Sequence, residues 1–321
     1  MDMQVDPQLN PAFKKSKKLW FEDGSVIIVT GEVGFRVYKG ALSACSDVFR
    51  DTFAMPQGSG SSQELFEDCP VVRLQDSARD MARFLDVVFN GAGIWCQDES
   101  QIYDWNIVRS VLTLSHKYQA ERLLTEGIRR LTARFPDTIE KWDVLYSTQG
   151  YLGDNGDLIS MPNMAKFLSL PHVHLLALYD CCNLSTADLL GGLTNTDGVL
   201  EVLSQEDMVM CVDGRINLAE ENTKLWEYRF SAPCPENCQK PGHNRCENAR
   251  RSLNERGLKM ARETYHNPLA PETDTYKALQ HKMCLHCAEY FVKRDTARRQ
   301  EIMDNLKTHL STRHNSSEVD E

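Results

Sequence analysis

The hydrophobic pattern of the first third of the chain alternates between short apolar runs and helical spacing. Residues 26–29 read VIIV and are apolar on both faces, as in a buried central strand. Phe35 and Val37 then alternate with polar residues, which predicts a second strand, and residues 71–74 predict a third. From Ala41 the apolar residues recur at the spacing of an amphipathic helix that packs on these strands.

A second helix follows the third strand. Apolar residues fill the positions i, i+3, i+4, i+7 and i+8 of a helix at Met81, Phe84, Leu85, Val88 and Phe89. The pair Asn90-Gly91 predicts its end, and residues 91–104 are expected to form a loop. Two further helices are centred near Val111 and Ile128, and Phe135-Pro136 closes this part of the chain.

After Pro136 all the patterns are helical. Asp137 and Glu140 have the spacing of a capping box, and Pro171 divides an apolar stretch at 164–182 into two helices. Ser204 and Asp207 predict the cap of another helix. At Ser231 the composition changes to one rich in proline, cysteine and polar residues.

These patterns predict an α+β protein with five segments. Residues 1–18 form a disordered basic tail, 19–135 a small sheet with helices packed on it, and 136–230 a helical region. Residues 231–311 form a Cys/His-containing helical module, and 312–321 form a second disordered tail. The tail lysines, Lys14, Lys15, Lys17 and Lys18, are read either as a nuclear import signal or as a solvated tail.

Charge and composition restrict the function. The formal net charge of -10 argues against a nucleic-acid or membrane-surface binder over the whole molecule, because phosphate binding needs a basic face. The N-terminus has no apolar segment of the kind found in secretory signals, so we expect a cytoplasmic or nuclear protein. In that reducing setting, the 11 cysteines are expected to be buried thiols or metal ligands rather than disulfides.

Several of the cysteines have the spacing of a structural zinc site. Cys284 and Cys287 form C-x2-C, which lets two thiolates bend around one tetrahedral ion. Earlier in the chain, Cys234 and Cys238 form C-x3-C, and Cys246 follows at the start of a predicted helix. We predict a closed Zn²⁺ site that would supply cohesion to a segment poor in apolar residues. The preferred ligands are Cys238, Cys246, Cys284 and Cys287, with Cys234 and His243 as competitors for the last place. The alternative is a set of unconnected thiols.

Residues 19–135 resemble a BTB/POZ domain. The resemblance is carried by FEDGSVIIV, FRVYKGALSACSDVFRDTF, VVRLQDSARDMARFLDVVFNG and VLTLSHKYQAERLLTEGIRRL. It implies a small sheet flanked by helical hairpins, which serves as a dimerisation or adaptor module without catalytic activity. Tyr38 stands where the family usually has histidine, Ser25 where many members have aspartate, and the loop 91–104 is long. The last two departures weaken any inference of the common homodimer mode or of cullin docking. The wider layout also resembles BTB proteins of mushroom-forming fungi.

We therefore expect a non-enzymatic adaptor or scaffold that binds a protein partner or a second copy, and one possible use is as a ubiquitin-ligase adaptor. The sequence has neither the Gly-Lys-Ser/Thr ending of a phosphate-binding loop nor a G-x-S-x-G elbow. The alternative is a nucleic-acid-binding transcriptional regulator, since residues 229–313 hold 16 Lys/Arg against ten Asp/Glu. The last predicted helix carries Lys293, Arg294, Arg298, Arg299 and Lys307.

Overall fold

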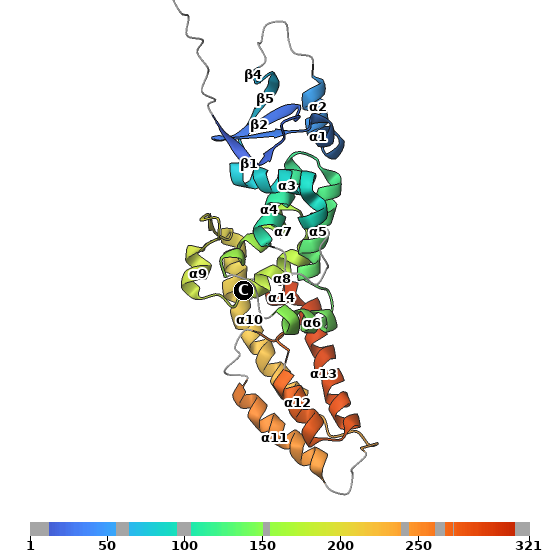
Figure 1. Ribbon diagram of the computed structural model, residues 1–321. Helices are drawn as coiled ribbons and strands as arrows, with labels where there is room; N and C mark the ends of the chain where they lie inside the picture. The colour runs from blue at the N-terminus through green and yellow to red at the C-terminus, as the bar shows by residue number, and fades with distance from the viewer. Residues whose placement is uncertain are drawn as a thin grey trace, which may run out of the picture. The chain divides into compact units, whose positions relative to one another are not determined.

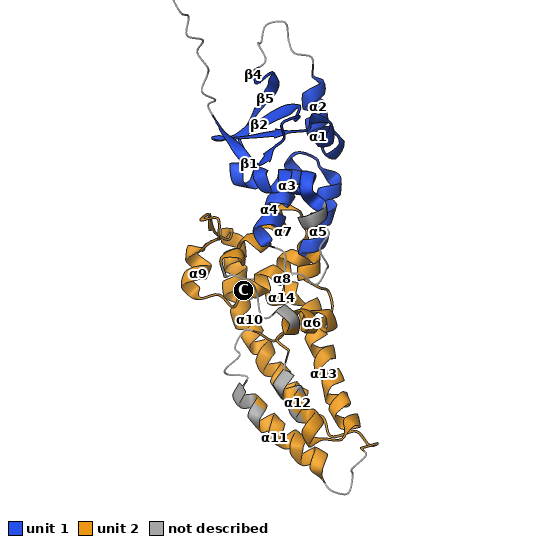
Figure 2. Ribbon diagram, viewed as in Figure 1, with its two compact units in different colours: residues 1–131 blue, residues 132–321 orange. Residues whose placement is uncertain are grey.

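The computed structural model describes residues 13–55, 64–94, 104–149, 155–238, 244–260, 267–271 and 273–311. The chain divides into two compact units, residues 1–131 and residues 132–321 (Figure 2). The division falls within the last turn of a helix, and the two units are called unit 1 and unit 2 below. The expected tail at 312–321 lies outside the described residues.

Unit 1 contains a five-stranded sheet in the order β1-β3-β2-β5-β4 (Figure 1). The strands are β1 (Lys14–Trp20), β2 (Val26–Thr30), β3 (Val33–Val37), β4 (Leu65–Phe66) and β5 (Cys69–Leu74). Every residue of β2 is buried, as its apolar run predicted. It pairs antiparallel with β3 across a turn in which Gly31 has a positive φ of 53°, and parallel with β5. The three predicted strands are confirmed, whereas β1 and β4 were not predicted.

The helices of unit 1 are α1 (Lys39–Cys45), α2 (Asp47–Ala54), α3 (Ala78–Ile94), α4 (Trp105–Lys117) and α5 (Glu121–Arg134). The single helix expected from Ala41 is therefore two helices. Ser46 separates them with an extended backbone, and its Oγ accepts a hydrogen bond from the Phe49 amide at 3.1 Å. The same hydroxyl donates to the Tyr118 carbonyl, so the break is fixed by a side chain that the apolar pattern does not reveal.

Helix α3 also differs from its prediction, because it passes Asn90-Gly91 and ends at Ile94. A glycine lowers helix stability by about 1 kcal/mol but does not forbid the conformation. The rest of the predicted loop up to residue 103 lies outside the described residues. Helices α1 to α4 and the sheet share one apolar core that includes Ile28, Phe49 and Phe84, so the expected α+β class is confirmed.

The basic segment before residue 19 is not a tail throughout, and that prediction is wrong for residues 14–18. Lys14 to Lys18 lie in β1, whose lysines point outward while Leu19 is buried. The Nζ atoms of Lys15 and Lys18 lie 2.7 Å and 2.6 Å from the carboxylates of Glu67 and Asp86. These lysines are part of an edge strand and do not form a free import signal. Residues 1–12 lie outside the described part of the chain.

Unit 2 is almost entirely helical. It contains α6 (Ile139–Gln149), the 3-10 turn η1 (Asn155–Asp157), α7 (Ser160–Phe167), α8 (Pro171–Cys181), α9 (Thr186–Gly191), α10 (Gln205–Arg229), α11 (Arg245–Met260), α12 (Thr273–Lys282), α13 (Leu285–Asp304) and α14 (Leu306–His309). Pro171 is the first residue of α8, so the predicted division of 164–182 is confirmed. A small hairpin of β6 (Leu193–Thr194) and β7 (Leu200–Glu201) was not predicted.

The expected helical region and the cysteine-containing module belong to the same unit. Helices α10 to α13 run side by side, as Figure 1 shows, and share an apolar cluster. Trp226 of α10 and Phe230, the C-cap residue of that helix, contribute aromatic side chains to it, although they precede the module. A Cβ added at Gly257 would lie only 2.6 Å from the Trp226 ring, so α11 approaches α10 closely. The module thus has an apolar core that its own composition does not indicate.

The predicted cap at Ser204 is confirmed. Its Oγ accepts a hydrogen bond from the Asp207 amide at 3.2 Å and donates to Asp207 Oδ2 at 2.7 Å. Asp207 is buried and also lies 3.1 Å from both Lys166 Nζ and His174 Nε2. Burial raises the pKa of Asp207. The hydrogen bonds from His174, Ser204 and Lys166 outweigh burial, and the pKa is lowered to about 2.

This carboxylate predicts a measurable loss of stability in acid. Because its pKa is lower in the folded state than in the unfolded state, ionised Asp207 stabilises the fold above about pH 4 by about 2 kcal/mol, and this contribution is lost between about pH 4 and pH 2. Asp207→Asn should therefore lower the free energy of unfolding by about that amount at pH 7 and by about half of it at pH 3, in the middle of this range. Urea unfolding of both proteins at the two pH values measures the difference.

Asp188 provides the control, because it occupies the same position after the N-cap Ser185 of α9 and is not buried. Asp188→Asn should change stability little at either pH. An Asp207→Asn effect that is equal at pH 7 and pH 3 would contradict the charge-based account.

Among the described helices, none combines the length and the apolar character required to span a bilayer.

Candidate metal centre

Four thiols from three segments of unit 2 converge at one point. Cys246 is the second residue of α11, Cys284 is the N-cap of α13, and Cys287 lies in the first turn of α13. Cys238 lies in the segment that follows α10. The Sγ atoms of these four residues all lie within 4.8 Å of one another. Cys238 is half-buried and the other three are buried, so the cluster is closed to solvent on most sides.

The spacing of the sulfur atoms suits a tetrahedral ion. A zinc ion bound at about 2.3 Å by four thiolates holds its sulfurs about 3.8 Å apart. The Sγ atoms of Cys238 and Cys284 are 4.0 Å apart. Only a small contraction would therefore bring the donors to the tetrahedral geometry. Four sulfur donors in this arrangement are typical of a structural zinc site or of an iron–sulfur centre.

Backbone amides point at two of the sulfurs. The Cys284 amide donates to Cys246 Sγ at 3.2 Å, and the Cys287 amide donates to Cys284 Sγ at 3.5 Å. Cys284 and Cys287 also lie at the N-terminus of a 20-residue helix, where the helix dipole favours negative charge. Both features stabilise thiolates, which is the protonation state that binds metal.

When no metal is bound, burial favours the neutral thiols over the thiolates. It raises the pKa of Cys287 and of Cys246, and it raises the pKa of Cys234 to about 11. A metal ion has to displace protons from these groups, so its affinity for the cluster falls as the pH falls.

Cys234 borders this group, and the pKa of its thiol responds to a hydrogen bond with Cys287. Cys234 packs against the same apolar cluster, but it is not one of the four thiols that lie within 4.8 Å of one another. His243 lies outside the described residues. The cysteines that received no metal prediction include Cys181, Cys182 and Cys211, which are buried in unit 2 away from this site.

One residue that positions the cluster was not found from the sequence. Arg245 Nε and Nη2 donate to the carbonyls of Lys282 and His281 at 3.2 Å and 3.1 Å. These bonds hold the start of α11 against the turn before Cys284. An arginine beside a cysteine carries no recognisable signal in the sequence, because its backbone partners are 36 and 37 residues away.

The basic residues of α13 do not form one exposed stripe. Arg299 is fully buried, and Arg298 pairs with Glu221 and Glu301, at 2.8 Å in each case. The Arg294 guanidinium lies over the Tyr228 ring, 4.1 Å from its centroid. Three of the five cations that suggested phosphate binding are thus engaged within unit 2.

Comparison with known proteins identifies unit 1. Residues 17–133 match the family model of the BTB/POZ domain. A search of the curated proteins found no match to the chain. The N-terminal part is thus a BTB/POZ domain with a small sheet and helices, as the quoted motifs predicted, and BTB/POZ domains are protein-interaction modules.

Proposed function

We propose that this protein is a non-enzymatic adaptor or scaffold that binds a protein partner or a second copy of itself through the BTB/POZ domain. The observation that carries the proposal is the match over residues 17–133, together with a sheet and helices in the arrangement that the family implies. Unit 2 serves as a spacer and as a second binding surface.

The surface of unit 1 favours contact through side chains over strand addition. The edge strand β1 carries four lysines, and charged edge strands resist pairing with another chain. Among the described residues of unit 1, the large apolar side chains with the greatest exposure are Met55 at 66% and Leu65 at 58%. A partner that covered these two side chains would remove their apolar surface from water. We infer that the partner covers them.

Sedimentation of the full chain tests this role. We expect a dimer at micromolar concentration, and conversion to a monomer when Met55 and Leu65 are both replaced by aspartate. Val144→Asp in α6 is the matched control, because Val144 is 63% exposed but lies in unit 2. If the chain is monomeric, cross-linking in extracts of the native cells should join unit 1 to another protein, and this link should be lost in the same double variant. A monomer without such cross-links would contradict the proposal.

We also propose that the four thiols hold one structural zinc ion. Cys238, Cys246, Cys284 and Cys287 would be its ligands, with Cys234 excluded. Four protein ligands leave no position open for water or substrate, so the ion would stabilise the fold and take no part in catalysis. Its effect would be to tie the segment after α10 to the starts of α11 and α13.

A further inference from the structure

The outer face of α10 exposes an apolar stripe. Val209 and Val212 are each 42% exposed and Ile216 is 50% exposed. Their positions, i, i+3 and i+7, place them on one side of the helix. The opposite side of α10 holds Cys211 and Leu218, which are fully buried in unit 2. The stripe therefore belongs to a second apolar face that is not used to form the core.

The stripe is part of a longer seam with heptad spacing. Val209, Val212, Ile216 and Ala219 alternate at intervals of three and four, and the polar residues Gln205 and Thr223 continue the spacing at its two ends. Alternating three- and four-residue spacing is typical of the positions through which two helices pack in a coiled coil. The seam runs from Gln205 to Thr223, about two and a half heptads, and ends before Trp226, which is buried in the core.

A row of carboxylates runs beside the seam. Glu206, Asp213, Glu220 and Glu227 follow one another at intervals of seven residues, on the same side of the apolar positions. Lys166 pairs with the first of them at 3.0 Å. The other flank of the seam includes Arg215, whose guanidinium donates to the carbonyls of Cys182 and Leu184 and so faces unit 2. The seam therefore has one strongly acidic border.

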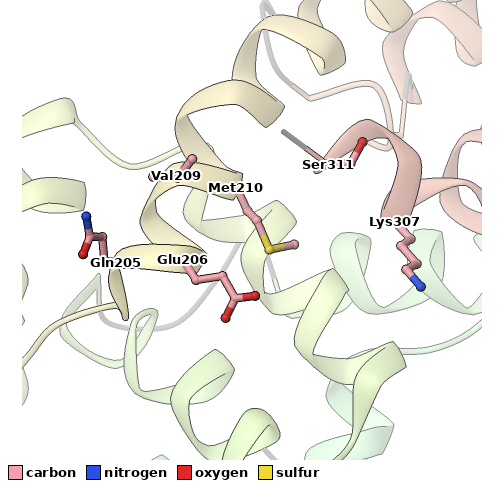
Figure 3. A pocket seen from close by; sticks show the side chains of 6 residues that line it. All are labelled: Gln205, Glu206, Val209, Met210, Lys307 and Ser311. Carbon is pink, nitrogen blue, oxygen red and sulfur yellow. The ribbon is translucent and has the colours of Figure 1, made fainter. Parts of the chain in front are cut away.

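A pocket opens at the N-terminal end of the seam. It has a volume of about 680 Å³ and is lined by Gln205, Glu206, Val209, Met210, Lys307 and Ser311. In Figure 3 the side chains of Glu206 and Met210 extend from α10 toward the segment that carries Lys307. Gln205 and Val209 also belong to the seam, so a helix lying along the seam could insert one large side chain here.

We propose that the outer face of α10 binds an amphipathic helix of a partner protein, with apolar residues at three- and four-residue intervals and Lys or Arg beside them. Helices dock in this way through apolar anchors at i, i+3 or i+4 and i+7. The acidic row favours partner helices with Lys or Arg beside their apolar residues, because opposite charges beside a seam determine which helices pair. This deepens the second binding surface of the proposed function and does not depend on the BTB/POZ domain or on a metal.

A second copy of α10 fits this face less well. In an antiparallel pair the two acidic rows would lie opposite each other, which is unfavourable. In a parallel pair each row would face Met208, Arg215 and Asn222, where the only cation already bonds to backbone carbonyls.

A pair of synthetic peptides tests the proposal with the full chain. Both have about 21 residues, or three heptads, with leucine and isoleucine at the seam positions, and they carry either lysine or glutamate at all flanking positions. We expect the lysine peptide to bind at least about tenfold more tightly than the glutamate peptide in fluorescence anisotropy. Val212→Asp with Ile216→Asp should weaken its binding by at least about tenfold, and Val144→Asp should not.

Charge reversal separates specific docking from loss of structure. Asp213→Lys with Glu220→Lys should reverse the preference, so that the glutamate peptide binds more tightly than the lysine peptide. Unfolding cannot produce such a gain. Equal binding of both peptides, or a preference that survives the reversal, would overturn the proposal. A change in the sedimentation of the peptide-free chain on Val212→Asp with Ile216→Asp would also overturn it, because the face would then be covered by a second copy.

Discussion

Replacing Cys284 and Cys287 together with serine is expected to abolish metal binding and to unfold the end of unit 2 formed by α11 and α12. A structural zinc site contributes on the order of 10 kcal/mol of folding free energy, which is comparable to the stability of a whole domain. The apolar cluster around Trp226 and Phe230 would retain part of the packing. Without the ion, however, the segment bearing Cys238 has little to hold it beside Cys284.

Element analysis of the purified wild-type chain should find about one zinc per molecule, and the double variant should contain none. Limited proteolysis should then cut the variant within α11 or α12 at concentrations of protease that leave these helices of the wild type intact. A chelator should convert the wild type to the same sensitive state, and added Zn²⁺ should restore it.

Cys234 is the matched control for this experiment. It lies four residues before Cys238 and packs against the same cluster, but the four-thiol group does not include it. Cys234→Ser should keep the metal and the protease resistance, whereas Cys238→Ser should lose both. A chain that contains no metal and still resists protease throughout this segment would contradict the zinc proposal. Loss of zinc from Cys234→Ser alone would place the fourth ligand at Cys234.

Local signals in the sequence were sufficient for elements whose causes are local. The apolar run of β2, the capping residue Ser204 and the division at Pro171 each act within a few residues, and the structure follows them. The break at Ser46 is different, because its hydroxyl donates to the carbonyl of Tyr118, 72 residues away. A strand formed by lysines was missed for a similar reason. The strand β1 depends on pairing with β3, whereas its own composition resembles that of a tail.

The same distinction applies to the candidate metal centre. Thiol chemistry and the C-x2-C spacing suggested the group Cys238, Cys246, Cys284 and Cys287, and the structure brings these four together. The residues that support the cluster could not be predicted in this way. Arg245 donates to carbonyls 36 and 37 residues away at the end of α12, and Trp226 fills the core from a helix that precedes the module. Their effect depends on tertiary packing that no local pattern encodes.

The second large effect is expected from Arg299→Met, which should lower the free energy of unfolding of unit 2 by about 3–5 kcal/mol. The Arg299 side chain is fully buried, and its Nη1 and Nη2 atoms lie 2.9 Å and 2.5 Å from the two carboxylate oxygens of Asp143. It also donates to the Leu269 carbonyl and lies 3.7 Å from Asp295, which in turn binds Arg229 at 2.5 Å.

The size of the loss follows from what the substitution leaves behind. Methionine fills most of the volume but leaves the Leu269 carbonyl and Asp143, which is 28% exposed, without their donor, and it removes one of the two arginines beside the buried Asp295. Arg298→Met is the control, since Arg298 is 29% exposed and its pairs with Glu221 and Glu301 should contribute only about 1 kcal/mol.

Adding Asp143→Leu to Arg299→Met should recover part of the loss, because removing both charges removes the unpaired carboxylate. Urea unfolding of the four proteins gives the comparison. If Arg299→Met proved as stable as Arg298→Met, the buried ion pairs would not hold α6 and α13 together, and the packing of unit 2 would have to rest on its apolar contacts alone.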